Sequence, residues 1–218
     1  MKDKVLAVLK NTDGYVSGQE LCEELGVSRT AVWKAVNALK EAGYEIESVR
    51  NRGYMLKSCP DVLLSEEIKS VLDTKWFAKK ILYFDKIDST NSEIKRQAEQ
   101  GASEGTLAIA EYQSAGRGRR GRSWDSPAGS GIWMSFLIKP DIRPEHAPMI
   151  TLLAAMACAS AVREVTGLEA MIKWPNDIVI GGRKITGILT EMSTEMETIS
   201  YVVVGIGINA NMTEFPED

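Results

Sequence analysis

The sequence is poor in the residues that build metal sites and disulfide frameworks. Its 218 residues include three cysteines and one histidine. Cys22, Cys59 and Cys158 lie far apart and form no Cys-x-x-Cys pair, which argues against a zinc site and against a disulfide scaffold. We expect all three to be small apolar residues that are buried or half-buried. His146 follows a proline in a predicted turn, so we expect it at the surface.

Long apolar segments are also lacking. No apolar run approaches the roughly 20 residues that a membrane-spanning helix needs, and the first residues lack the apolar centre of a signal peptide. With 44% hydrophobic residues, the chain has enough material for one large or two small domains. We expect a cytoplasmic protein with no membrane contact.

Positive charge is scarce overall, because 26 lysines and arginines face 30 acidic residues and leave a formal net charge of -4. The balance is uneven along the chain. Residues 1–58 carry a net charge of about +1 and the remainder about -5. Any contact with nucleic acid is therefore expected from the N-terminal part, and it should be local.

One segment concentrates the positive charge. The run from Gln113 to Trp124, here called the arginine loop, holds four arginines and three glycines but no acidic residue. Apolar segments at 106–112 and 131–138 frame it and are typical of strands. Unpaired charge cannot be buried, so a loop is predicted. Arginine binds phosphate bidentately and glycine lets backbone amides approach, so we expect a loop that closes over a phosphate-bearing anion.

Two alternatives for the arginine loop are weaker. Gly116, Gly118 and Gly121 match the letters of a dinucleotide-binding fingerprint, but that motif must open a helix, and the residues after Ser123 do not continue as one. An RNA-binding arginine-glycine segment normally lies in a long low-complexity tail. This segment is short and framed by strands.

The first sixty residues predict three helices and a hairpin. The helices are expected at 2–9, at 18–25 with a capping box from Ser17 and Glu20, and at 29–41 with Ser28 as N-cap. Strands at 44–50 and 54–56 follow about a turn. This layout resembles a winged-helix DNA-binding domain. The alternative is a helix-turn-helix used only for protein contact.

In a winged helix the third helix enters the major groove, and the wing contacts phosphates or the minor groove. The DNA-binding candidates are Ser28, Arg29, Thr30, Trp33, Lys34, Asn37, Arg50 and Arg52. A net charge near +1 makes one copy a weak binder, so dimerisation is expected.

A polar segment with a proline marks a domain boundary, so we predict a DNA-binding domain at 1–58, a linker at 59–64 and a second domain at 65–218. In the second domain we predict helices at 64–72, 91–100 and 148–165, the last buried against a sheet. Strands are predicted at 81–84, at 171–180 with a break at its proline, from Arg183, and at 199–208 in the sheet interior. Ser89, Thr90 and Asn91 could simply cap a helix. Lys184 is either a solvated strand end or a cation held over the sheet.

Several motifs then carry a family resemblance. They are Asp88-Ser-Thr-Asn91, Gln113, Gly116-Arg-Gly-Arg-Arg-Gly-Arg-Ser-Trp124, Lys173-Trp-Pro-Asn-Asp177, Arg183-Lys-Ile-Thr-Gly187 and Val204-Gly-Ile-Gly-Ile-Asn209. Their order and spacing resemble biotin protein ligases, and the winged helix in front resembles the bifunctional kind that is also the biotin operon repressor. The resemblance implies an α+β fold, in which a class II synthetase-like ligase domain has a mixed β-sheet flanked by helices. Lipoate ligases share this fold but lack the basic loop.

The resemblance also implies a chemistry. Such ligases join biotin to ATP, usually with Mg²⁺, and pass the biotinyl group from biotinyl-5′-AMP to a lysine of biotin carboxyl carrier protein. By analogy the catalytic residues would be Lys184, Arg119 and Arg117. Biotin would contact Ser89, Thr90, Asn91, Gln113, Gly116, Arg117, Gly118, Arg119, Lys184 and Gly187. The nucleotide would contact Arg119, Arg120, Arg122, Trp124, Lys173, Asn176 and Asn209, although Trp124 could instead be a plain core aromatic.

In the family the adenylate-bound form dimerises and binds operator DNA, so the adenylate is expected to act as co-repressor here. Family members usually continue for about a hundred residues past Asp218, a length within ordinary domain limits, and that C-terminal part is expected to be absent. Two other functions remain open. One is a repressor that responds to biotin without catalysis, and the other is a nucleic-acid protein that uses the arginine loop as its contact.

Overall fold

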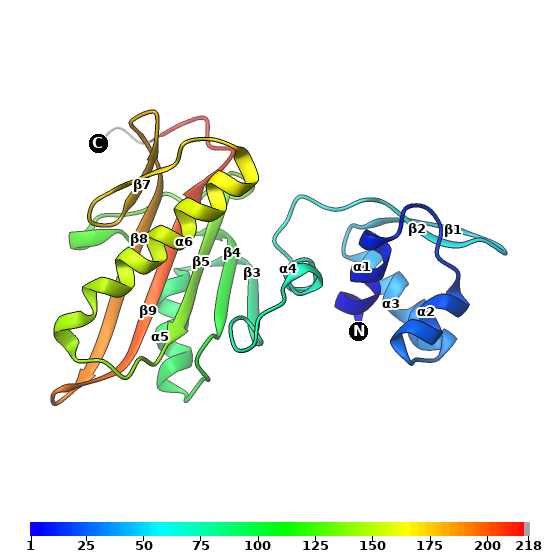
Figure 1. The fold of residues 1–218 in the computed structure, drawn as a ribbon, viewed down its shortest axis with the longest axis horizontal. Coiled ribbons are helices and arrows are strands. Elements are labelled where there is room, and N and C mark those ends of the chain that lie inside the picture. Colours follow the sequence, from blue (N-terminus) through cyan, green and yellow to red (C-terminus); the bar gives the residue numbers. More distant parts are fainter. Residues whose placement is uncertain (216–218) are drawn as a thin grey trace. The chain divides into compact units, whose positions relative to one another are not determined.

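The structure, a computed structural model, describes residues 1–215 and divides into two compact units, Met1–Asp73 and a second from Thr74 onward (Figure 1). Each unit has its own hydrophobic core. Each unit is described by itself.

The first unit begins with three helices whose ends follow local capping signals. They are α1 (Lys2–Asn11), α2 (Gly18–Leu25) and α3 (Arg29–Glu41). The Ser17 hydroxyl accepts from the Glu20 backbone amide and the Glu20 carboxylate accepts from that of Ser17, which completes a capping box. Ser28 accepts from the Ala31 amide at the start of α3. The predicted bounds of α2 and α3 are confirmed.

A hairpin completes the winged helix. Strands β1 (Glu45–Val49) and β2 (Gly53–Ser58) pair antiparallel. The turn between them needs left-handed backbone at Asn51 and Gly53. A Cβ at Gly53 would lie 2.0 Å from the Val16 carbonyl oxygen, so only glycine fits there. The wing therefore packs closely against the segment before α2. Leu6, Leu21 and Leu39 belong to the core of this unit.

Helix α4 (Ser65–Val71) belongs to the first unit. It is held to α1 by the ion pairs Lys2–Glu66 and Lys10–Glu67, and the Tyr44 hydroxyl donates to Glu67 at 2.6 Å. The compact unit thus extends to Asp73, beyond the linker predicted at 59–64. The reason is tertiary, because these contacts join residues far apart in sequence.

The second unit is built on one mixed seven-stranded sheet. Its strands are β3 (Ile81–Ile87), β4 (Leu107–Gln113), β5 (Gly131–Ile138), β6 (Met171–Lys173), β7 (Asp177–Ile180), β8 (Arg183–Glu195) and β9 (Thr198–Asn209). They lie in the order β3-β4-β5-β9-β8-β7-β6, with β3 and β4 parallel and the other neighbours antiparallel. The strand at 199–208 was predicted to be interior, and β9 confirms it.

Helices cover both faces of this sheet (Figure 1). Helix α5 (Thr90–Glu99) packs Ile94 against Leu137 and Val203, whereas α6 (Pro148–Thr166) packs on the opposite face against Val202 and Val204. Adjacent strand residues point to opposite faces. Val203 therefore packs against α5, whereas Val202 and Val204 pack against α6. The predicted α+β class with a mixed sheet flanked by helices is confirmed.

Helix α6 departs from two expectations. Together with the 3₁₀ turn η2 (Pro144–His146) it forms a helical stretch, Pro144–Thr166, that is long and apolar enough by composition to cross a membrane. The expectation that no apolar segment approaches this length is therefore corrected. Ile150, Ala155 and Cys158 pack in the sheet core, while Leu153 and Met156 are exposed, so the helix is only half-buried.

Three smaller predictions can be compared directly. All three cysteines are free; Cys22 is half-buried and Cys158 buried, as expected, but Cys59 is exposed because it lies in the connection after β2. His146 is at the surface as predicted. The proline at 175 lies in the turn between β6 and β7 and not inside a strand.

Candidate functional site

A cavity of about 250 Å³ opens on the α5 face of the sheet. Strand register decides which residues reach it. Ser135 on β5 lies opposite Gly205 on β9, which lies opposite Leu189 on β8. The next row along the same face is Trp133, Gly207 and Gly187. Residues in register share a face, so this face has glycines where a bulky side chain would fill the cavity.

The glycines let other side chains lie directly on the sheet. A Cβ at Gly207 would lie 2.4 Å from Trp124 Nε1, and one at Gly187 would lie 2.6 Å from the same indole ring. A Cβ at Gly205 would lie 1.9 Å from Asn91 Oδ1. Something was expected to approach the glycines of β9 closely, and Trp124 and Asn91 do so.

One wall of the cavity is polar and comes from the start of α5. Ser89, Thr90 and Asn91 are 2%, 3% and 4% exposed. Ser89 occupies the N-cap position but makes no side-chain cap hydrogen bond. The simple capping explanation therefore does not account for these residues, which are buried beside a cavity.

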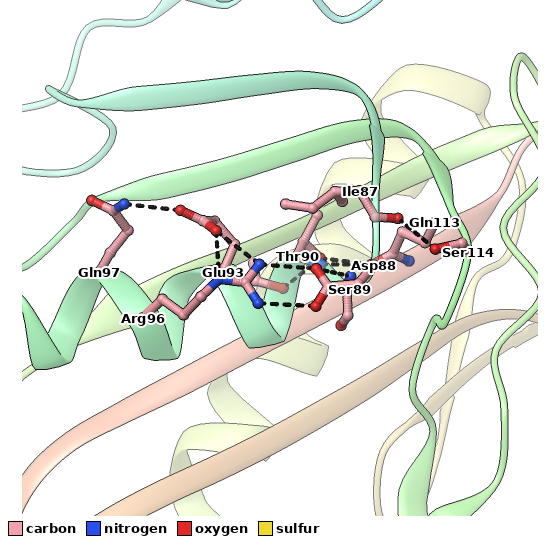
Figure 2. A network of polar contacts seen from close by, with 10 residues as sticks. Ile87, Asp88, Ser89, Thr90, Glu93, Arg96, Gln97, Gln113 and Ser114 are labelled. Atoms are coloured by element: carbon pink, nitrogen blue, oxygen red, sulfur yellow. Dashed lines mark hydrogen bonds and ion pairs between the residues drawn. The ribbon is translucent and has the colours of Figure 1, made fainter.

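A continuous hydrogen-bond chain runs along this wall. The Thr90 backbone amide and hydroxyl both contact Gln113 Oε1, at 2.8 and 3.1 Å (Figure 2). The Thr90 and Ser135 hydroxyls are 2.7 Å apart, and Ser135 donates to Asn91 Oδ1 at 2.6 Å. At the other end Gln113 Nε2 donates to the Ser126 hydroxyl at 2.8 Å. The chain presents amide and hydroxyl groups of fixed orientation to the cavity.

An ion pair fixes the corner between β3 and α5. Arg96 donates two hydrogen bonds of 2.9 Å to the two carboxylate oxygens of Asp88, and the Ser89 amide donates to Asp88 Oδ1 (Figure 2). The hydrogen bonds from Arg96 lower the pKa of Asp88 to about 2, although its partial burial acts in the opposite direction. Sequence analysis did not identify Arg96; the pairing of an acid before the helix with a base near its end was the available signal.

The arginine loop is folded back on itself between β4 and β5. Arg117 and Ser123 form an isolated bridge, the Gly118 amide donates to the Arg122 carbonyl at 2.7 Å, and the Trp124 amide donates to the Gly116 carbonyl at 2.9 Å. A 3₁₀ turn, η1 (Arg119–Gly121), lies at its tip. The arginines of the loop all line the cavity: Arg117, Arg119, Arg120 and Arg122. The predicted loop between two strands is confirmed.

Two other elements meet the loop. Arg119 Nη1 donates to Asn176 Oδ1 at 2.7 Å, and Asn176 Nδ2 donates to the Ile188 carbonyl at 3.0 Å. Lys184 Nζ lies 2.9 Å from Asp177 Oδ1 and 5.1 Å from the centre of the Trp124 ring. Of the two alternatives for Lys184, the structure favours a cation held over the sheet.

Trp124 has features of both predicted roles, a core aromatic and a nucleotide contact. Its ring packs on the sheet glycines and edge-on against Trp133 at 6.5 Å, as a core aromatic would. It also lines the cavity, and its buried Nε1 has no hydrogen-bond partner among the described residues. A ring that is half-buried and half in the cavity can contact a flat ligand.

The cavity gathers most of the predicted ligand-binding residues but not all of them. The predicted residues that line it are Ser89, Thr90, Asn91, Gln113, Arg117, Gly118, Arg119, Arg120, Arg122, Trp124, Asn176, Lys184 and Gly187. Gly116, whose carbonyl accepts from the Trp124 amide, lies outside this lining, as do Lys173 on β6 and Asn209 at the end of β9. Sequence analysis missed Ser135 and Glu191. Ser135 is a polar residue in the otherwise apolar strand β5, which was an available signal, whereas β8 is rich in polar residues and does not single out Glu191.

The predicted DNA-binding residues lie on the outer face of α3 and at the wing. Ser28, Arg29, Thr30, Trp33, Lys34, Arg50 and Arg52 are exposed, and Asn37 is half-buried. Trp33 is 55% exposed, which is high for a large aromatic side chain. Arg29 donates to Gln19 at 2.9 Å, and Arg52 lies 4.3 Å from the centre of the Tyr15 ring. Arg29 and Arg50 line one groove between α3 and the wing.

These features define a class of protein. A winged helix-turn-helix unit precedes an α+β unit whose sheet bears a cavity with a polar wall and a cationic loop. The pattern of the Biotin/lipoate A/B protein ligase family matches residues 83–209, and that of an HTH domain matches residues 2–55. The chain therefore belongs to the biotin/lipoate A/B protein ligase family.

Similar proteins carry both parts. The bifunctional ligase/repressor BirA of Bacillus subtilis (strain 168) is 42% identical over 219 residues, covering 100% of this chain and 67% of the relative. The protein of the same name from Escherichia coli (strain K12) is 34% identical, covering 98% of this chain and 65% of the relative. This chain spans about two thirds of the length of these curated relatives.

Solved structures agree with this assignment. The biotin protein ligase of Aquifex aeolicus in complex with biotin and ATP matches with a TM-score of 0.52 and 35% identity, over 64% of this chain and 56% of that chain. The biotin protein ligase of Leishmania major in complex with biotinyl-5-AMP matches with a TM-score of 0.53 and 28% identity, over 64% and 60% of the two chains.

Proposed function

We propose that this chain is an ATP-dependent biotin protein ligase that also represses transcription of the biotin operon. It forms biotinyl-5′-AMP from biotin and ATP, transfers the biotinyl group to a lysine of biotin carboxyl carrier protein, and uses the adenylate as co-repressor on operator DNA. The observation that carries the proposal is the cavity itself, where a polar wall lies beside four arginines and Lys184.

The polar wall suits the head group of biotin. A ureido ring has one acceptor oxygen and two N–H donors, which the amide and hydroxyl groups of Thr90, Asn91 and Gln113 match. The fused apolar ring would lie against Trp124, which packs on the sheet glycines and lines the cavity. The valeryl carboxylate then extends toward the arginine loop and Lys184.

The cationic side suits adenylate formation. A carboxylate oxygen of biotin bonds to the α-phosphorus of ATP, while the bond from that phosphorus to the bridging oxygen of pyrophosphate breaks. Two anions must approach one another, so preorganised positive charge lowers the barrier. Lys184 stabilises the charge at the α-phosphate, and Arg117, Arg119, Arg120 and Arg122 neutralise the phosphates. Trp124 and Asn176 contact the nucleotide.

Mg²⁺ fits this site as a companion of ATP. Residues 1–215 contain no cluster of three His, Cys, Asp or Glu side chains that could hold a metal, but nucleotide-bound Mg²⁺ needs only one or two carboxylates. Asp177 lines the cavity beside Lys184 and would hold it. When bound, the ion would neutralise charge on the leaving pyrophosphate.

In the second step the amine of the carrier lysine attacks the acyl carbon of biotinyl-5′-AMP. An amide bond forms, AMP leaves with the bonding electrons, and the attacking nitrogen loses a proton. Because water would hydrolyse the mixed anhydride, the arginine loop protects it by closing over the cavity. The adenylate-bound form dimerises and binds the operator through α3 and the wing, as a soluble protein of the cytoplasm.

Biotin-dependent release of pyrophosphate from ATP tests the proposal. The wild-type chain should release pyrophosphate only when biotin is present, and Lys184→Met should slow this release on the order of 100-fold. Lys139→Met removes an exposed lysine of the same unit and is the matched control. Biotin binding in calorimetry without pyrophosphate release would instead support a non-catalytic, biotin-responsive repressor. An operator shift that needs no biotinyl-AMP would contradict the co-repressor role.

A further inference from the structure

Glu191 on β8 is shared by groups from two different parts of the second unit. Its carboxylate accepts from Asn91 Nδ2 at 2.8 Å and from Lys95 Nζ at 2.7 Å, and Arg117 Nη2 lies 3.4 Å away. Asn91 and Lys95 are one turn apart on α5, whereas Arg117 belongs to the arginine loop. The Glu191 side chain is only 19% exposed. Glu191 lies outside the sequence motifs that carry the resemblance to biotin protein ligases.

An ionised carboxylate can only accept hydrogen bonds. Asn91 must therefore turn its NH₂ group toward Glu191 and its carbonyl oxygen toward Ser135, which donates to it at 2.6 Å. The proton of Ser135 is used in this contact, so the 2.7 Å contact with Thr90 needs the proton of the Thr90 hydroxyl. Gln113 Oε1 then keeps the Thr90 backbone amide as its donor. The direction of the hydrogen bonds from Asn91 through Ser135 to Thr90 therefore follows from the charge of Glu191.

The charge state of Glu191 agrees with this role. Burial alone would raise the pKa of Glu191, but the hydrogen bonds from Asn91 and Lys95 and the charges of Lys95 and Arg117 outweigh it and lower the pKa below its usual value. The carboxylate is therefore ionised at neutral pH. It also faces the first arginine of the loop, so the polar wall and the cationic loop meet at one side chain.

We propose that Glu191 is a positioning residue, which orients the Asn91 amide, and with it the hydrogen bonds through Ser135 to Thr90, for ligand recognition, and which holds Arg117 at the edge of the cavity. The inference rests on the proposed function in one respect, because it takes biotin as the ligand that reads this orientation. The alternative is a purely structural ion pair with Lys95.

Three single variants separate these roles. Glu191→Gln keeps the shape of the side chain but removes the charge, so the Asn91 amide is held in its orientation only by the longer contact of its Nδ2 with the Leu189 carbonyl at 3.4 Å. Biotin affinity measured by calorimetry should fall on the order of tenfold, since a hydrogen bond to a charged group is lost. Lys95→Met removes the ion pair but keeps the acceptor for Asn91, so its biotin affinity should stay near that of wild type. Glu195→Gln makes the same chemical change at an exposed position on the same strand and is the matched control.

A double variant tests the orientation itself. Asn91→Asp places a second carboxylate against Glu191 and should weaken biotin binding more than Glu191→Gln does, because like charges repel. In Asn91→Asp with Glu191→Gln, the glutamine NH₂ can donate to the new carboxylate, and Ser135 can still donate to its other oxygen. This pair should recover affinity to within about tenfold of wild type. No recovery in the double variant would overturn the inference.

A measurement without ligand separates this inference from the proposed function. The side-chain amide of Asn91 in ¹⁵N spectra should shift and lose protection from exchange in Glu191→Gln but not in Lys95→Met. Equal changes in both variants, or none, would overturn the positioning role. A wild-type chain that binds no biotin, while this amide still responds to Glu191→Gln alone, would overturn the proposed function and support the positioning of Asn91.

Discussion

Ser17, Ser28 and Ser89 each occupy the N-cap position of a helix, and the two units use these serines differently. Ser17 and Ser28 in the first unit accept hydrogen bonds from the amides of the first helical turn. Ser89 in the second unit has the same position at α5 but makes no such bond, and it is 2% exposed beside the cavity. Ser17 and Ser28 cap their helices. Ser89 does not cap α5 and instead lies at the candidate site, where departures from local sequence preferences are often found.

The same contrast extends to glycine. Gly53 in the first unit supplies a left-handed turn residue to the wing. Gly205 and Gly207 in the second unit lie in the middle of a strand, where glycine costs stability, and Asn91 and Trp124 lie on them. In the first unit the unusual residues build the fold, and in the second they make room for side chains of the site.

The largest expected effect concerns the independence of the two units. Leu39→Ala removes a fully buried side chain from the core of the first unit and should lower the unfolding free energy of that unit by roughly 3 kcal/mol. The second unit has separate cores, so its unfolding transition and its biotin affinity should not change. Differential scanning calorimetry measures both transitions. Val71→Ala, at an exposed position of the same unit, is the control, and a joint shift of both transitions would contradict the comparison.

A smaller effect is expected when a methyl group is added at Gly116 within the arginine loop. A Cβ at Gly116 would lie 2.2 Å from the Trp124 carbonyl oxygen, whereas one at Gly118 would have no contact closer than 3.3 Å. Gly116→Ala should displace the loop, cost about 1–3 kcal/mol and speed dissociation of biotinyl-5′-AMP correspondingly. Gly118→Ala should change the dissociation rate much less. Stopped-flow dissociation measures this, and similar rates for the two variants would argue that the loop does not hold the adenylate.

The serine comparison predicts an effect of intermediate size. Ser17→Ala should lower the stability of the first unit by about 1 kcal/mol, because a cap hydrogen bond is lost. Ser89→Ala loses no cap bond, so it should cost α5 less and should appear mainly as weaker biotin binding. Urea denaturation followed by circular dichroism, together with calorimetric titration, measures the two quantities. Equal losses of stability would show that Ser89 is an ordinary cap.

The smallest expected effect is the pH dependence of the Asp88–Arg96 pair. The pKa of Asp88 falls from 3.8 to about 2 in the folded protein, chiefly through hydrogen bonds from Arg96. A lowered pKa stabilises the fold above the unfolded value, and this stability is lost as the pH falls from 3.8 toward 2. The Asp88 side chain is 47% exposed, so solvent screening reduces the contribution to less than about 1 kcal/mol.

Asp88→Asn should therefore flatten the loss of stability between pH 4 and pH 2, a range of roughly two units about the shifted pKa. Thermal unfolding of the second unit at several pH values measures it. Asp141→Asn removes an exposed carboxylate of the same unit and should keep the wild-type dependence. An unchanged profile in Asp88→Asn would mean that the ion pair adds nothing to the corner that carries Ser89.

Local signals account for what could be predicted. The bounds of α2 and α3 follow from serines and a glutamate within one turn of the chain, and the two glycines at 181 and 182 predicted the turn between β7 and β8, where both have positive φ. The arginine loop was predictable because four charges on a glycine-rich segment cannot be buried unpaired. The position of α4 and the half-burial of α6 depended on contacts with distant residues.

The sequence by itself determined the helix starts, the alternating strands and the concentration of cations in one loop, because each depends on neighbours a few residues away. Only the tertiary structure decided that Asn91, Ser135 and Glu191 would share one face of the sheet. That outcome depends on the register of β5, β9 and β8, which joins residues up to 100 positions apart, and no local pattern specifies such a register.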